Sequence, residues 1–260
     1  MAANFWSSSQ CDLLLEARER RAEEASRAPK PKARPRRRQI VLRGVEPEPG
    51  EPGSSGGGPG SVVTQLVDYA VLLSKELKIR QRPVLTACAY LWRLRTETLD
   101  PPENAVGWSE LDDERHITAV TMACVYLACK VEEQPVSADK VAGFSQGLCS
   151  ATDLLDAELC VLEDLSASLV VHHPIDDVER YASLVHADGE ASKVAMACAE
   201  ETRRTDLLLR YPPHVIALGC LRVAMALEGA DTLPWCEQNG VCKEDVKGVC
   251  AELVKRCRSL

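Results

Sequence analysis

Between residues 117 and 133 the chain is apolar or small at nearly every position, and the stretch then ends in charge. Its apolar residues, from Ile117 to Val131, are spaced as one helical stripe. A helix that is apolar on all sides is typical of the centre of a helical domain rather than of its surface. The charges at its end are Lys130, Glu132 and Glu133. They form either a solvated helix end or a docking site for a partner.

A second helix of this kind is predicted over residues 214–227, which follow the sequence Tyr211-Pro212-Pro213 and carry a single charge, Arg222. From Ser61 onward the apolar spacing is helical, and no segment shows convincing strand alternation. We therefore predict an all-α fold of two tandem five-helix repeats, residues 61–170 and 171–260, each built around its third helix. The expected helices lie near residues 63–77, 83–92, 117–131, 137–147 and 152–165 in the first repeat, and near 175–185, 194–198, 214–227, 234–235 and 246–257 in the second.

The residues before these repeats differ in composition. Residues 7–26 can form a helix, so residues 1–26 are predicted to be an additional N-terminal helix. Phe5 and Trp6 precede it, either as a hydrophobic staple or as an anchor that packs on a partner or on the rest of the chain. Residues 27–60 are rich in Pro, Gly and Ser, and this composition predicts a disordered linker. Its basic run at 30–38 is either a nuclear localisation signal, a weak phosphate contact or a solubilising part of the linker.

Charge is unevenly distributed along the chain. The first 60 residues hold 11 basic and 8 acidic residues, whereas the other 200 hold 20 basic and 31 acidic ones. The repeats therefore carry a net charge of −11, which makes them a poor surface for nucleic acid, and we expect no direct nucleic acid binding. No apolar run is long enough for a membrane span, and the N-terminal ten residues lack the features of a signal peptide, so we expect an intracellular protein without a membrane partner.

Neither the cysteines nor the glycines indicate a catalytic or metal site. The twelve cysteines include no Cys-x-x-Cys pair or Cys/His cluster, and many lie on apolar helical stripes, among them Cys124, Cys160 and Cys220. We expect reduced, structural cysteines, as in the cytosol or nucleus. The sequence also has no Gly-rich phosphate loop and no Gly-x-Ser-x-Gly elbow. An enzyme is thus the least favoured class, and no cofactor is expected.

Two motifs resemble those of the cyclin family. Tyr126-Leu-Ala-Cys-Lys-Val-Glu-Glu133 is similar to the Leu-Ala-x-Lys-x-Glu-Glu signature of the first cyclin box, and Ala157-Glu-Leu-Cys-Val-Leu162 is similar to the motif in its fifth helix. Three more passages resemble the cyclin C group, the Mediator-associated type. They are Asn4-Phe-Trp6, Val171-His-His-Pro174 and residues 204–224. The resemblance covers roughly residues 4–17 and 61–236, and implies two cyclin-box repeats.

The resemblance implies a regulatory subunit that binds and activates a cyclin-dependent Ser/Thr kinase of the Mediator complex and so regulates transcription by RNA polymerase II. It also implies contact with other Mediator kinase-module subunits and a nuclear location. The protein is not expected to be an obligate homo-oligomer. Lys130 would donate to carbonyls of the kinase and Glu158 would accept from its backbone N–H groups, unless both are merely exposed charges. The full set of expected kinase-binding residues is Lys130, Glu133, Glu158, Val131, Leu162, Leu169, Phe5 and Trp6.

Asp206, Arg210 and Tyr211 have two interpretations. They are either an ordinary helix end, or part of a groove between the two repeats that takes a peptide from another protein.

The sequence departs from the family pattern at two places. The linker at 27–60 replaces a continuous helical lead into the first box, and residues 82–92 lack the Met-Arg-Ala-Ile-Leu patch of cell-cycle cyclins.

A cyclin-fold protein that binds DNA and the TATA-binding protein needs a basic face, which the charge of the repeats argues against. A cyclin-fold transcription scaffold that binds a non-kinase partner is the main alternative.

Overall fold

The computed structural model describes residues 59–94, 110–227, 229–230, 232, 236 and 240–257. The described chain divides into two compact units between Val170 and Val171. It contains helices and no strand, so the prediction of an all-α fold is confirmed. Several predicted features lie outside the described residues: Phe5, Trp6 and the N-terminal helix, the linker up to residue 58, and most of the short helix near 234–235.

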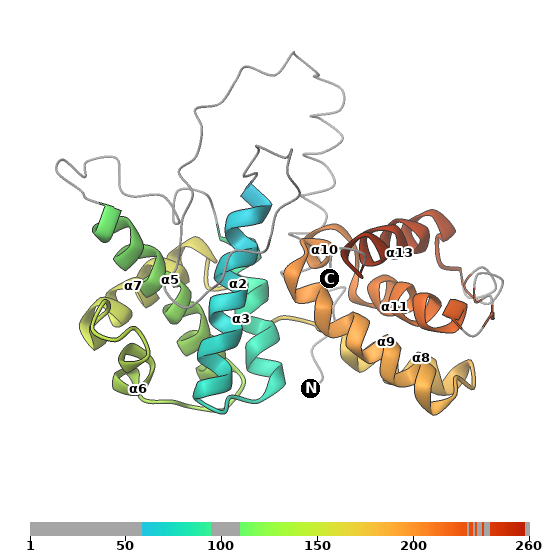
Figure 1. Ribbon diagram of the computed structural model, residues 1–260, viewed down its shortest axis with the longest axis horizontal. Helices are drawn as coiled ribbons and strands as arrows, with labels where there is room; N and C mark the ends of the chain where they lie inside the picture. Colours follow the sequence, from blue (N-terminus) through green and yellow to red (C-terminus); the bar gives the residue numbers. More distant parts are fainter. Residues whose placement is uncertain are drawn as a thin grey trace, which may run out of the picture. The chain divides into compact units, whose positions relative to one another are not determined.

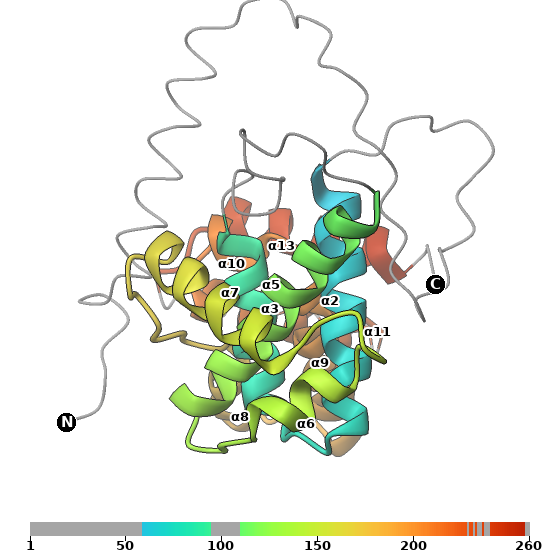
Figure 2. The same cartoon turned by 90° about the vertical axis from the view of Figure 1, so that its left-hand side faces the viewer.

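The first unit contains five described helices, and the third of them is its centre. This helix, α5, packs on α2, α3, α6 and α7, and α2 and α3 pack on each other (Figures 1 and 2). From Ile117 to Cys129 every residue of α5 is buried except Tyr126, as its apolar pattern predicts. The helices of this unit are α2 (Pro59–Glu76), α3 (Gln81–Arg93), α5 (Glu110–Val131), α6 (Ala138–Gly143) and α7 (Ala151–Asp164).

The second unit repeats this plan around α11, which packs on α8, α9 and α13 (Figure 1). Residues Val215 to Leu221 of α11 are all buried. Gly219 permits the close approach of α13, because an added Cβ would lie 2.8 Å from the Cβ of Val249. The helices of this unit are α8 (Pro174–Leu184), α9 (Gly189–Glu201), the 3-10 helix η2 (Thr202–Arg204), α10 (Leu207–Arg210), α11 (Pro213–Leu227) and α13 (Lys243–Cys257).

Some sequence expectations were wrong in detail. Helix α6 ends at Gly143 rather than near 147, because the chain turns around the Ser145 side chain. The Ser145 hydroxyl donates a hydrogen bond to the carbonyl of Ala142 and accepts one from the amide of Cys149. The short elements η2 and α10 were not predicted. Cys160 was assigned to an apolar stripe, yet it is exposed on α7. Ten cysteines of the described residues, from Cys88 to Cys250, are free thiols.

Five described helices end in a left-handed residue, and four of these residues are not glycine. After α5, Glu133 has a φ of 54°, and the amide of Gln134 donates to the carbonyl of Cys129 at 2.8 Å. This is the hydrogen bond that closes a Schellman motif, so it ends α5 directly after Lys130 and Val131. Lys78, Ser166 and His186 end α2, α7 and α8 in the same way, and Gly229 ends α11.

No helix in the described ranges is long and apolar enough to cross a membrane.

Candidate partner-docking surface

The end of α5 and the outer side of α7 bring Lys130 and Glu158 together. Their Nζ and Oε1 atoms lie 2.5 Å apart, and the Lys130 side chain is 43% exposed whereas that of Glu158 is 9% exposed. The Lys130 ammonium also lies 4.4 Å from the ring centroid of Tyr126, one turn earlier on α5. The two charges expected from the sequence are therefore one site, in which a nearly buried carboxylate lies beneath a partly exposed ammonium.

The two consecutive glutamates at the end of α5 have different surroundings. Glu132 accepts a hydrogen bond of 2.7 Å from the Thr86 hydroxyl and pairs with Arg82 at 3.0 Å, and both partners belong to α3. Glu133 is exposed. Glu132 thus ties α5 to α3, whereas Glu133, the residue predicted to contact a partner, is available on the surface.

Gln134 adds a second connection at this place. Its side-chain carbonyl accepts from the amide of Arg80 at 3.0 Å, and its NH₂ group donates to the carbonyl of Lys78 at 3.5 Å. Both groups belong to the loop between α2 and α3. The Glu132 and Gln134 contacts fix the position of the α5 end, which carries Lys130. Neither role could be predicted from the sequence.

The apolar surface beside the ion pair is wider than expected. Of the predicted residues, Val131, Leu162 and Leu169 are half-buried. Leu155 and Leu159 are 43% and 62% exposed, and with Leu162 they form a stripe along the outer side of α7. The spacing of these three leucines in the sequence puts them on one face of α7, and that face points outward. The core side of α7 is formed instead by Leu154, Ala157 and Val161.

Leu169 is held in place through its backbone. The hydroxyl of Tyr90, on α3, donates to the Leu169 carbonyl at 2.7 Å. Tyr90 is fully buried, and burial raises its pKa well above the ordinary value of a tyrosine, so it remains a neutral donor. The segment after α7 is therefore fixed to the same helix, α3, that Glu132 contacts.

In the second unit, Arg210 pairs with Asp206 at 2.8 Å and with Glu252 at 3.9 Å, and its guanidinium lies 5.8 Å from the ring centroid of Tyr211. Asp206, Arg210 and Tyr211 are thus brought together within this unit. These contacts fit the interpretation as a helix end, and the peptide groove stays a prediction.

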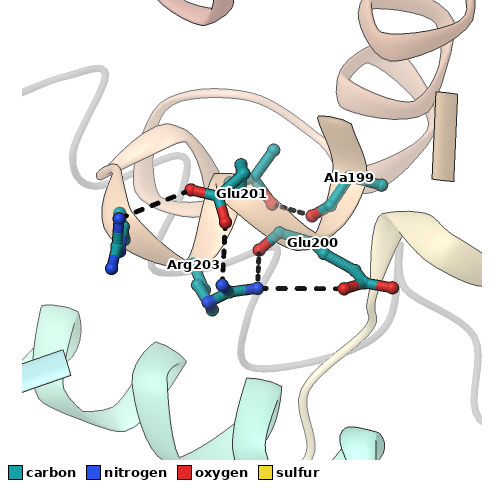
Figure 3. A network of polar contacts seen from close by, with 6 residues as sticks. Ala199, Glu200, Glu201 and Arg203 are labelled. Carbon is teal, nitrogen blue, oxygen red and sulfur yellow. Dashed lines mark hydrogen bonds and ion pairs between the residues drawn. The ribbon is translucent and has the colours of Figure 1, made fainter. Parts of the chain in front are cut away.

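A neighbouring polar network follows the end of α9 (Figure 3). Arg203 donates to the carbonyl of Glu200 at 3.1 Å and to the carboxylate of Glu201 at 2.7 Å. The Glu201 carboxylate also lies 3.8 Å from Arg204. These arginines have acidic neighbours, so the network stabilises the turn into η2 and offers no excess positive charge. The described residues contain no group of three or more His, Cys, Asp or Glu side chains placed to hold a metal ion.

Comparison with known proteins identifies the class. Residues 59–170, which form the first unit from α2 to the end of the segment after α7, match the family described as "Cyclin, N-terminal domain". A chain of the yeast TFIIK (Kin28/Ccl1/Tfb3) complex has the same fold, with a TM-score of 0.59 and 18% identity over 95% of this chain and 97% of that chain. The protein is therefore a two-unit helical protein with the cyclin fold.

Two relatives narrow the class further. Cyclin-C1-2 of Arabidopsis thaliana is 31% identical over 72% of this chain and 72% of its own length. The RNA polymerase II holoenzyme cyclin-like subunit of Yarrowia lipolytica is 28% identical over 87% of this chain and 76% of its own length. The chain belongs to the cyclin family, and it is a cyclin C-like member of that family.

Proposed function

We propose that this cyclin binds a cyclin-dependent Ser/Thr kinase through the surface around Lys130 and Glu158 and thereby activates the kinase. The observation that carries the proposal is the buried carboxylate of Glu158 beneath the Lys130 ammonium, beside the exposed leucines of α7. A nearly buried charge next to exposed apolar side chains is costly on a free surface and is well suited to a partner that covers both. The remaining docking residues are Glu133, Val131, Leu162 and Leu169.

The chemistry at the docking surface follows from the two charged groups. An ammonium carries three donors, so Lys130 can keep its contact with Glu158 and still donate to a carbonyl of the kinase. The carboxylate of Glu158 can accept backbone N–H groups with its second oxygen. Once the apolar rim of Leu159 and Leu162 excludes water, charge-assisted hydrogen bonds of this kind are stronger than neutral ones.

Activation by such binding needs no catalytic group from the cyclin. A protein kinase transfers phosphate only when its Lys–Glu ion pair and its metal-binding Asp are both in place. A subunit that binds this arrangement more tightly than the inactive one shifts the kinase toward it. The protein is accordingly a regulatory subunit and not itself an enzyme.

The proposed setting is the Mediator complex in the nucleus, where the kinase and the other kinase-module subunits would act on transcription by RNA polymerase II. The support for this setting is the name of the Yarrowia relative, RNA polymerase II holoenzyme cyclin-like subunit, and the similarity to cyclin C proteins. If no kinase binds, the alternative function is that of a cyclin-fold scaffold with a non-kinase partner.

A charge exchange tests the docking surface. The double variant Lys130→Glu, Glu158→Lys keeps the two residues as an ion pair within the chain but reverses the charges offered to a partner. We expect it to fold and to lose kinase binding by at least tenfold, since losing a buried charged partner costs about 2–5 kcal/mol. The matched control reverses the exposed pair Glu190–Lys193, whose Nζ–Oε1 distance is 2.7 Å.

The measurements are co-purification with recombinant cyclin-dependent kinase, the dissociation constant, and kinase activity on a peptide from the tail of RNA polymerase II. The control should bind and activate as the unaltered protein does. Kinase binding that survives the Lys130/Glu158 exchange would show that this surface does not dock the kinase.

A further inference from the structure

One aromatic side chain interrupts the buried part of α5. Between Ile117 and Cys129, Tyr126 is the residue that is not buried, and its ring lies against the Lys130 ammonium at 4.4 Å. An apolar residue of similar size would satisfy the packing of a central helix, so packing does not account for an aromatic ring at the surface here. The ring and the Glu158 carboxylate together contact the same ammonium group.

We propose that Tyr126 is a positioning residue, whose ring holds the Lys130 ammonium in the orientation that receives the partner. The inference rests on the proposed function, because it assigns Tyr126 a role in the same docking surface. A lysine has a flexible four-carbon stem and loses rotamer freedom when it binds. Contacts that order the stem before binding remove part of that entropy loss and so increase affinity.

The geometry also favours one direction for the free donor. The Glu158 carboxylate pairs with the Lys130 ammonium on one side, and the ring face of Tyr126 attracts the ammonium from a second side. The third side remains open to solvent, which agrees with the 43% exposure of the Lys130 side chain. A carbonyl of the partner would approach from that side.

The test compares Tyr126→Phe, which keeps the ring, with Tyr126→Leu, which removes it. A cation–π contact at a partly exposed site corresponds to about a 2- to 5-fold change in an equilibrium constant. Tyr126→Leu should weaken kinase binding by about that factor, whereas Tyr126→Phe should bind as the unaltered protein does. A matched control is Tyr181→Leu, which removes a ring that lies 4.8 Å from the Arg180 guanidinium on α8 and should leave binding unchanged.

A Lys130→Met background separates positioning from packing. If Tyr126 acts through Lys130, Tyr126→Leu should have no further effect on binding once Lys130 is replaced. A loss of the same size in both backgrounds overturns the inference, because the ring would then act without Lys130. Equal binding by all Tyr126 variants of the otherwise unaltered protein overturns it as well.

A measurement on the free cyclin makes the result independent of the kinase. The ring of Tyr126 should shift the nuclear magnetic resonances of the Lys130 Hε protons upfield, and the shift should persist in Tyr126→Phe and disappear in Tyr126→Leu. Absence of this shift in the unaltered protein overturns the inference whatever the kinase does. If the shift is present but Lys130→Met binds the kinase normally, the proposed docking function fails, and the role of Tyr126 in that docking fails with it.

Discussion

The Glu132 carboxylate accepts a 2.7 Å hydrogen bond from the hydroxyl of Thr86, and this contact joins the end of α5 to α3 across 46 positions of sequence. Thr86 is fully buried, so the bond lies at the edge of the core and not in solvent. Because Lys130 is only two residues away, the same bond fixes the part of α5 that carries the proposed docking charge. Glu132 thus contributes to stability, whereas Glu133 is the member of the pair that is proposed to contact the partner directly.

Replacing each glutamate by alanine should separate these two effects. Glu132→Ala removes the charged acceptor of the Thr86 bond and should lower the free energy of unfolding by about 1–3 kcal/mol. Glu133→Ala changes an exposed side chain and should change the free energy of unfolding by no more than about 0.5 kcal/mol. It should nevertheless weaken kinase binding. Urea unfolding and a binding titration of both variants provide the check. Equal destabilisation by the two substitutions would contradict the assignment of their roles.

A second prediction concerns the packing of α11 on α13. Gly219→Ala adds a methyl group against the Cβ and Cγ1 of Val249, a buried side chain that cannot rotate away freely. Overpacking of this kind should cost about 1–3 kcal/mol of stability. The control is Gly189→Ala, since a Cβ at Gly189 would meet no atom within 4 Å. Thermal unfolding of both variants measures the difference, and similar melting temperatures for the two would refute the close contact.

Much of the fold could be predicted because α5 and α11 are apolar on every side, and such helices have one stable location, the centre of a helical unit. The orientation of α7 could not be predicted in the same way. Leu155, Leu159 and Leu162 form one apolar stripe, and Leu154, Ala157 and Val161 form another. Periodicity alone does not say which of two apolar stripes faces the core.

The same limit applies within the candidate site. Lys130 and Glu158 were expected to act together, and the structure brings them within 2.5 Å. Which of the adjacent Glu132 and Glu133 contacts α3 depends on where Thr86 and Arg82 lie in space, and no local pattern contains that information. The role of Lys130 and Glu158 in kinase docking stays a prediction.

The left-handed residue after α8 gives a third prediction. His186 has a φ of 52° and is exposed, and the amide of Ala187 donates to the carbonyl of Ala182 at 3.0 Å. Glycine adopts this conformation without the steric cost that a Cβ imposes. His186→Gly should therefore stabilise the protein by about 0.5–1 kcal/mol, whereas His186→Ala should give no such gain. Chemical denaturation of the two variants makes the comparison, and a loss of stability in His186→Gly would contradict it.

The last prediction is a pH dependence at the start of α7. Ser150 accepts from the amide of Asp153 at 3.1 Å, and the Asp153 carboxylate accepts from the amide of Ser150 at 2.9 Å, which forms a capping box. The hydrogen bonds from Ser150 hold the pKa of Asp153 below its ordinary value. A carboxyl group whose pKa is lower in the folded state stabilises the protein above the pKa of the unfolded chain, and this contribution disappears as the pH falls through the folded value.

Asp153→Asn should consequently be less stable than the unaltered protein at neutral pH, and the difference should shrink as the solution is acidified below the ordinary pKa of an aspartate. Ser150→Ala should cost about 0.5–2 kcal/mol at neutral pH through loss of the cap. Unfolding curves between neutral and acidic pH measure both effects. Asp156→Asn, which changes a carboxylate on the exposed side of the same helix, is the control. If the stability difference for Asp153→Asn stays constant across that range, the capping box does not account for the lowered pKa.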